Sequence, residues 1–372
     1  MTVDVAPEAS AKDRAGPAPM APGAEPGRRL SWWLVAGALA AFGGLAAILV
    51  IAPRAAAGGW LLAFVLCGSP AIGSVFALLI HALTGGRWLS AFADIFVVTA
   101  ATTPFFGLLF IPVLVFLPHF YPWVEGANPP PDDVRGLYLN APFFIIRSVV
   151  ALSFWSVLGI FLPRLTGGRK MLIAAVGLAA HAFVIGLIGV DWILSLQPEF
   201  WSSSFGATLA FTQFAAALAW VAIVSPGERD TGARADIGGL LLATLLGLSY
   251  LNFIALLVIW YGNLPDRVFW FVFRERWPWT LVADLAFVLG AVIPIFMLFL
   301  QRVRSGRREL RFVGVVTLAG VALYYAYLIA PPFGVLSLGA GLLAAVAIFC
   351  LLGALTFALR GPRRVQVERG TK

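Results

Sequence analysis

Ten long apolar stretches constrain the fold of this 372-residue sequence more than any other feature. A helix needs about 20 mostly apolar residues to cross a bilayer, where each backbone polar group must be bonded within the segment. The composition agrees, because 60% of the residues are hydrophobic and only 12% are charged, about half the charged share of a soluble protein. The sequence therefore predicts an all-α integral membrane protein with ten transmembrane helices, at residues 31–52, 59–84, 89–117, 139–163, 171–195, 204–224, 237–260, 279–301, 311–330 and 335–359.

The two ends of the chain differ from the predicted 31–359 transmembrane domain. Residues 1–30 are rich in Pro, Ala and Gly and contain no apolar run, which predicts a disordered tail. This tail is too long and too rich in proline for the charged region of a signal peptide, so we expect the first helix to stay in the mature protein. Residues 360–372 form a short basic tail, and Pro104 and Pro112 predict a kink in the third helix.

The basic residues predict the orientation. Of the 26 Lys and Arg residues, 20 fall on the side of the two tails and five on the opposite side, and Arg147 lies within the fourth helix. Positively charged loops tend to stay in the cytoplasm, so both termini are predicted to be cytoplasmic. The net charge of +8 then comes from basic residues at the cytoplasmic side of the membrane, and it does not indicate a nucleic-acid partner.

The residues that bind metals and haem are scarce. Cys67 and Cys350 lie in separate apolar stretches, with no CxxC motif and no histidine at ligand spacing. His81 and His181 could be imagined as haem ligands, but their predicted depths in the membrane differ. We therefore expect this chain to bind no metal or redox cofactor, so that another chain would carry any electrons.

A few ionisable residues fall at membrane depth, where such groups are costly and often functional. One interpretation is a proton-conducting or quinol-facing set, in which His and Asp side chains exchange protons. The alternative is structural, with Arg147 paired to Asp191 and His81 paired to Asp94 to fix helix packing. The candidate residues are Arg147, Asp191, His181, Asp284, His81 and Asp94.

Three connections on the predicted outer side are rich in aromatic residues, proline and acids. They span Pro118–Tyr138, Leu196–Ser203 and Tyr261–Pro278, and the first is longer than a helix connection requires. Their tryptophans could anchor the protein at the lipid interface, as aromatic belts do. The remaining aromatic content favours a surface on which another subunit docks.

The segments Tyr138–Arg147, Asp191–Ser203 and Ile259–Asp266 resemble stretches of the ActF-type membrane subunit of alternative complex III. That family belongs to bacterial quinol:electron-acceptor oxidoreductases and is similar to the NrfD and polysulfide-reductase membrane subunits. The resemblance covers about the second to the ninth helix. The residues that match are Asn140, Arg147, Asp191, Trp192, Trp260, Tyr261, Asn263 and Asp266. The basic stretch Arg302–Arg311 and the N-terminal tail depart from the family's core.

The resemblance implies a multi-pass protein of a bacterial cytoplasmic (inner) membrane, with two four-helix bundles flanked by outer helices. It also implies partners: a homologous NrfD-like membrane subunit that binds the quinol, and multihaem cytochrome and iron–sulfur subunits on the outer face. The resulting hypothesis is a cofactor-free membrane subunit of a quinol:electron-acceptor (cytochrome c-type) oxidoreductase, acting as scaffold and proton path rather than as a stand-alone catalyst. The alternatives are a proton-coupled secondary transporter and a structural assembly factor.

Overall fold

The structure is a computed structural model, and it describes residues 26–124, 137–198, 200–225 and 230–359. In these residues there is no strand, and ten helical segments are long and apolar enough to cross a membrane, which confirms the predicted fold class. The main helices are α1 (Pro26–Ile51), α2 (Pro53–Thr84), α3 (Arg87–Ser90), α4 (Ala93–Ala100), α5 (Thr103–Leu109), α6 (Ile111–Val115), α7 (Leu117–Phe120), α9 (Ala141–Phe161), α10 (Gly167–Trp192), α11 (Phe205–Val224), α12 (Thr231–Tyr261), α13 (Pro265–Val272), α14 (Trp279–Phe287), α15 (Ile293–Leu298), α16 (Gln301–Ser305), α17 (Arg307–Ile329) and α18 (Leu336–Leu359).

Short 3-10 turns lie at η2 (Leu162–Arg164), η3 (Leu194–Leu196) and η5 (Pro331–Phe333). A π-helical turn, η4 (Val288–Val292), joins α14 to α15. The predicted third helix is divided into α3 to α7, and Pro104, Pro112 and Pro118 each stand in the first turn of a new segment. Proline lacks the N–H that would continue the preceding helix, so the predicted kink is confirmed as a series of breaks.

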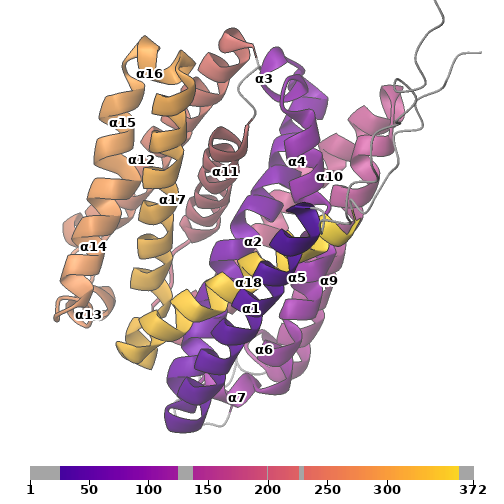
Figure 1. The fold of residues 1–372 in the computed structure, drawn as a ribbon. Helices are drawn as coiled ribbons and strands as arrows, with labels where there is room; N and C mark the ends of the chain where they lie inside the picture. Colours follow the sequence, from indigo (N-terminus) through magenta and orange to yellow (C-terminus); the bar gives the residue numbers. More distant parts are fainter. Residues whose placement is uncertain (1–25, 125–136, 199, 226–229, 360–372) are drawn as a thin grey trace, which may run out of the picture.

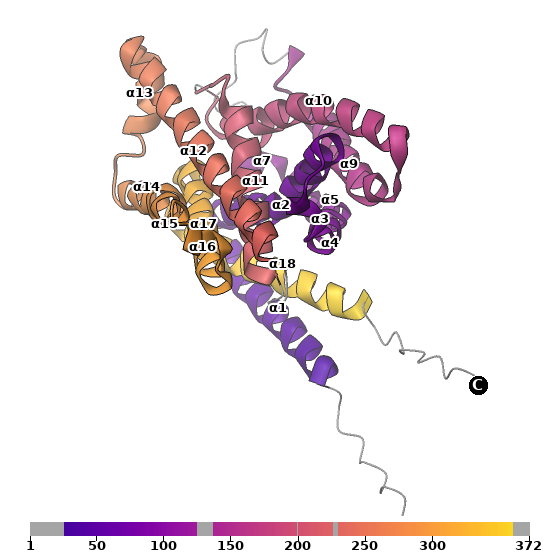
Figure 2. The same cartoon turned by 90° about the horizontal axis from the view of Figure 1, so that it is seen from above.

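The spans form two four-helix bundles (Figure 1). Helices α2, α4–α5, α9 and α10 make the first bundle, and α11, α12, α14–α15 and α17 make the second. The two bundles meet where α2 and α10 pack on α11. Helices α1 and α18 lie outside both bundles and pack on each other and on α2, as the view from above shows (Figure 2). This arrangement matches the predicted architecture.

Small residues allow the closest helix contacts. A Cβ added at Gly59 of α2 would lie 2.5 Å from the Cβ of Ala340 in α18, and one added at Gly206 of α11 would lie 2.6 Å from the Cα of Gly186 in α10. Backbones that approach this closely gain packing contacts, which drive helix association in lipid. The glycines therefore fix where the bundles and the outer helices meet.

The connections fall at two ends of the molecule. We call the end that carries α3 and α16 the basic end, and the end that carries α7, η3 and α13 the motif end (Figure 1). At the basic end Arg87 of α3 forms an exposed ion pair with Asp236 of α12, with Nη2 and Oδ2 3.8 Å apart. Which end faces the cytoplasm stays a prediction. The predicted tails lie outside the described residues except for residues 26–30, which belong to α1.

Candidate functional site

Arg147 and Asp191 form a buried ion pair near the motif end of the first bundle. Asn140 caps α9 by accepting a hydrogen bond from the amide N–H of Phe143 at 3.1 Å, and Arg147 follows within the second turn of the helix. The guanidinium donates from Nε to Oδ2 of Asp191 at 2.6 Å and from Nη2 to Oδ1 at 2.9 Å. The Asp191 side chain is fully buried and that of Arg147 is 15% exposed. This two-bond geometry is the strong form of an arginine–carboxylate pair.

Two tyrosines flank the pair. The Tyr138 ring lies 4.0 Å from Cζ of Arg147, and its hydroxyl donates to the carbonyl of Leu187 at 3.4 Å. The Tyr121 hydroxyl donates to the carbonyl of Trp192 at 3.2 Å. Burial, and then the negative charge of Asp191, raise the pKa of both phenols above the ordinary value, so both stay protonated at neutral pH. The carboxylate thus lies near two neutral phenols whose hydroxyls donate to backbone carbonyls, and it receives its own hydrogen bonds from Arg147.

The backbone around Asp191 is held from two sides. Ser195 donates to the carbonyl of Asp191 at 2.5 Å, and the indole N–H of Trp192 donates to the hydroxyl of Ser148 at 3.0 Å. The Trp192 ring also packs against the ring of Phe110, with centroids 4.9 Å apart. A side chain on so constrained a turn keeps its position, which is what a precise charged site requires.

His181 lies deeper in the same bundle. The indole N–H of Trp155 donates to Nδ1 of His181 at 3.0 Å, so a neutral imidazole carries its proton on Nε2. The ring stacks on Phe76 with centroids 4.8 Å apart, and Nε2 has no hydrogen-bond partner among the described residues. In this arrangement His181 can donate at Nε2, and it cannot accept a proton at Nδ1 while Trp155 holds that atom.

The other predicted site residues lie elsewhere. His81 is at the basic end, where Nδ1 lies 3.0 Å from the carbonyl of Gly85, and Asp94 is exposed in the first turn of α4 at that same end. Asp284 is exposed on α14 in the second bundle. Among the six ionisable candidates, the structure joins Arg147 directly to Asp191.

The third resembling segment lies at the motif end of the second bundle. Trp260 and Tyr261 close α12 with exposed side chains, at 77% and 86%. Asn263 takes a positive φ of 47° in the turn to α13, a conformation that asparagine tolerates better than most residues. Asp266 stands in the first turn of α13, but its side chain lies outside the described part of the structure.

Arg274, in the predicted connection Tyr261–Pro278, is buried. Its guanidinium donates to the carbonyls of Trp270, Tyr327 and Leu328 at 3.0 to 3.1 Å, and Cζ lies 3.5 Å from the Trp270 ring centroid. Burial lowers the pKa of Arg274 to about 9, so the group stays cationic at neutral pH. It stabilises the last carbonyls of α17, where a cation opposes the helix dipole, and it ties the segment after α13 to the second bundle.

Tyr138 is the other residue that sequence reasoning missed as a site member, although it opens the segment in which Arg147 was recognised.

The structure contains no group of three His, Cys, Asp or Glu residues placed to hold a metal within residues 26–124, 137–198, 200–225 and 230–359. No protein-family model matches this chain, and no curated protein matches it either.

Proposed function

We propose that this chain is an integral membrane subunit of a quinol:electron-acceptor oxidoreductase complex in a bacterial cytoplasmic membrane, without a redox cofactor of its own. The observation that carries the proposal is the meeting of two of the three resembling segments. Tyr138 and Arg147 from the first segment and Asp191 and Trp192 from the second form one buried site, although they are far apart in the sequence. Eight spans in two four-helix bundles, with two further spans outside them, agree with the architecture that the resemblance implies.

The site supports a role in proton transfer better than a role in electron transfer. Asp191 is the only carboxylate in the pair, and it can accept a proton only when Arg147 releases it. The guanidinium is the partly exposed member, so a neighbouring subunit or its quinol can compete for it from outside the bundle. We propose that such competition couples events in the neighbouring quinol-binding subunit to the protonation of Asp191.

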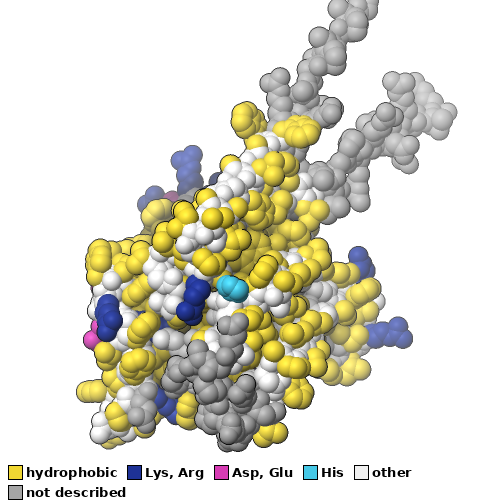
Figure 3. Space-filling model, turned by 90° about the horizontal axis from the view of Figure 1, so that it is seen from below, with side chains coloured by type: hydrophobic (Ala, Val, Ile, Leu, Met, Phe, Trp, Pro, Cys, Tyr) yellow, Lys and Arg dark blue, Asp and Glu magenta, His cyan; other side chains and the backbone are white. Residues whose placement is uncertain are grey.

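The motif end supports docking of extrinsic subunits. Its surface shows few charged side chains and much hydrophobic surface (Figure 3). Trp201, Trp260, Tyr261 and Trp277 are all more than half exposed there. Aromatic side chains of this kind are enriched in protein interfaces, where they bury large area with few rotatable bonds. The proposed partners are a homologous membrane subunit and multihaem cytochrome and iron–sulfur subunits.

Purification of the affinity-tagged full chain from its native membrane tests the proposal. We expect haem-containing and iron–sulfur proteins and a second membrane subunit to co-purify, with quinol-oxidising activity in the complex. The chain separated from these partners should show no stoichiometric haem in its visible spectrum. Recovery of the chain alone from mildly solubilised membranes, or haem bound by the separated chain, would contradict the proposal.

A proton-coupled transporter is the alternative, and the helix breaks argue against it. Transporters often place interrupted helices at equivalent positions in two repeated halves. Here the interrupted spans are the second helix of the first bundle, α4–α5, and the third helix of the second bundle, α14–α15. Because these positions are not equivalent, the breaks do not define a substrate site between repeated halves.

A further inference from the structure

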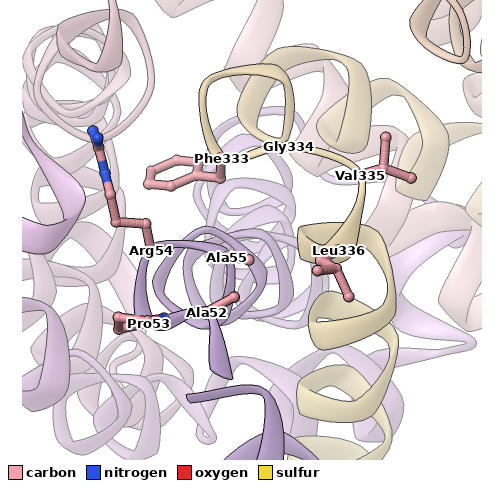
Figure 4. A pocket seen from close by; sticks show the side chains of 8 residues that line it. All are labelled: Ala52, Pro53, Arg54, Ala55, Phe333, Gly334, Val335 and Leu336. Carbon is pink, nitrogen blue, oxygen red and sulfur yellow. The ribbon is translucent and has the colours of Figure 1, made fainter. Parts of the chain in front are cut away.

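A pocket at the motif end lies where two helix connections meet. It is lined by residues 52–55, at the start of α2, and by residues 333–336, in the connection from α17 to α18. Figure 4 shows Arg54 and Phe333 on one side of this pocket and Val335 and Leu336 on the other. Its volume of about 410 Å³ is in the range of pockets that hold small molecules or parts of larger ones, about 300 to 1,000 Å³.

The walls of the pocket are fixed by close packing. The Phe333 ring contacts the backbone of α2 at Gly58, where a side chain would collide with it. Gly334 has a φ of 82°, a conformation that glycine adopts without strain, and it turns the chain into α18. Gly59, the residue after Gly58, allows α18 to approach α2 at Ala340. The pocket is therefore a preformed feature of the contact between α2 and α18.

The chemistry of the pocket joins one cation to an apolar surface. Arg54 is exposed and has no ion-pair or hydrogen-bond partner among the described residues. The other lining residues are apolar, and none of the eight is Asp or Glu. Val335 and Leu336 are more than half exposed, and so is Ile51, which ends α1 just before the pocket residue Ala52. The pocket thus offers a guanidinium for an anion and an apolar groove next to it, at the end of four membrane-spanning helices.

We propose that this pocket binds one phospholipid with a net negative headgroup. The phosphodiester pairs with Arg54, because a guanidinium binds phosphate oxygens with two parallel hydrogen bonds. The adjoining acyl chain lies along Leu336 and Val335, where apolar contact replaces bulk lipid. The absence of a carboxylate in the lining disfavours headgroups that carry an ammonium group, since nothing there would pair with it. The bound lipid would contact both the start of α2 and the start of α18. This lipid-binding proposal is independent of the proposed function of the chain.

Native mass spectrometry of the full chain tests the site. The protein is reconstituted in an equal mixture of phosphatidylethanolamine and phosphatidylglycerol, extracted gently, and its retained lipids are counted. We expect the wild type to retain phosphatidylglycerol, and Arg54→Gln to retain at least about tenfold less, because it loses the two charge-assisted hydrogen bonds to the phosphate. Leu336→Trp, which fills the groove and leaves the cation, should lower retention as well.

Arg276→Gln is the matched control, because Arg276 is an exposed cation at the same end that does not line the pocket. It should retain lipid as the wild type does. Equal retention by wild type and Arg54→Gln would overturn the proposal, as would an equal loss in Arg276→Gln or equal retention of the two lipids by the wild type. Circular dichroism melting of each variant in the same lipid checks that the fold is kept.

Discussion

The Arg147–Asp191 pair can be tested by a double-mutant cycle with Arg147→Gln, Asp191→Asn and the double variant. Each single variant removes two hydrogen bonds and leaves an unpaired ionisable group that is wholly or mostly buried. Breaking a buried pair in this way costs about 3 to 5 kcal/mol. The double variant leaves neither ionisable group behind, so we expect it to lose less than the sum of the single losses, with a coupling of about 2 kcal/mol or more.

The assay is equilibrium unfolding of the purified full chain in detergent micelles, followed by helical circular dichroism. Arg87→Gln is the control, because it breaks an arginine–aspartate pair that is largely exposed at the basic end. Exposed pairs contribute about 0.2 to 1 kcal/mol, so the control should unfold almost as the wild type does. Additive losses in the cycle, or a control that loses as much as Asp191→Asn, would refute the assignment of a coupled buried pair.

The same variants separate structure from function. If the pair takes part in proton transfer, Asp191→Asn lowers quinol-dependent turnover per assembled complex, beyond its effect on the amount of complex formed. The double variant should recover assembly but not turnover, because it restores charge balance without restoring an acid. A double variant that recovers both would assign Arg147 and Asp191 to packing alone.

Three further predictions concern stability. Trp155→Phe should destabilise the chain by about 1 to 3 kcal/mol in the same unfolding assay, because the buried Nδ1 of His181 loses its hydrogen-bond donor. Gly59→Ala should weaken the packing of α18 on α2, measured by the yield of a cysteine crosslink between these helices, whereas Gly43→Ala should not, because no atom lies within 4 Å of the added Cβ. Arg274→Gln should expose the segment after α13 to limited proteolysis, because three carbonyls lose their shared donor.

The fold was predictable from hydropathy because a membrane demands long apolar helices whatever their side-chain packing. The helix ends were less predictable. We expected a helix from residue 59, but α2 begins at Pro53, since proline suits the first turn and the small residues that follow are buried against neighbouring helices. We expected a helix from residue 237, but α12 begins at Thr231, where Asp230 caps it by accepting from the Gly232 amide at 2.9 Å. Both extensions add polar or small residues that hydropathy alone does not count.

The candidate site was predictable where charge is scarce. Arg147 and Asp191 stand out because membrane helices rarely contain charged residues, and opposite charges in neighbouring spans indicate a pair. Tyr138 could not be recognised in this way, since a tyrosine before a helix has many places to lie. The burial of Arg274 was equally hidden, because it depends on how the segment after α13 folds back on α17. The one local signal was Trp270, one helical turn earlier in the sequence.

If protons pass through this site, Asp191 accepts them only as Arg147 moves away. His181 is no simple substitute, since its Nδ1 accepts a hydrogen bond from Trp155 and a neutral ring already carries a proton on Nε2. Tyr121 and Tyr138 hold their protons at neutral pH, because burial and Asp191 raise the pKa of each. Asp191 is fully buried, and an unpaired buried charge is costly. Removal of the cation in Arg147→Gln should therefore leave Asp191 protonated, and an infrared band of a carboxylic acid should appear that the wild type lacks. Asp191→Asn in the same background should abolish that band, and its persistence would assign the proton to another group.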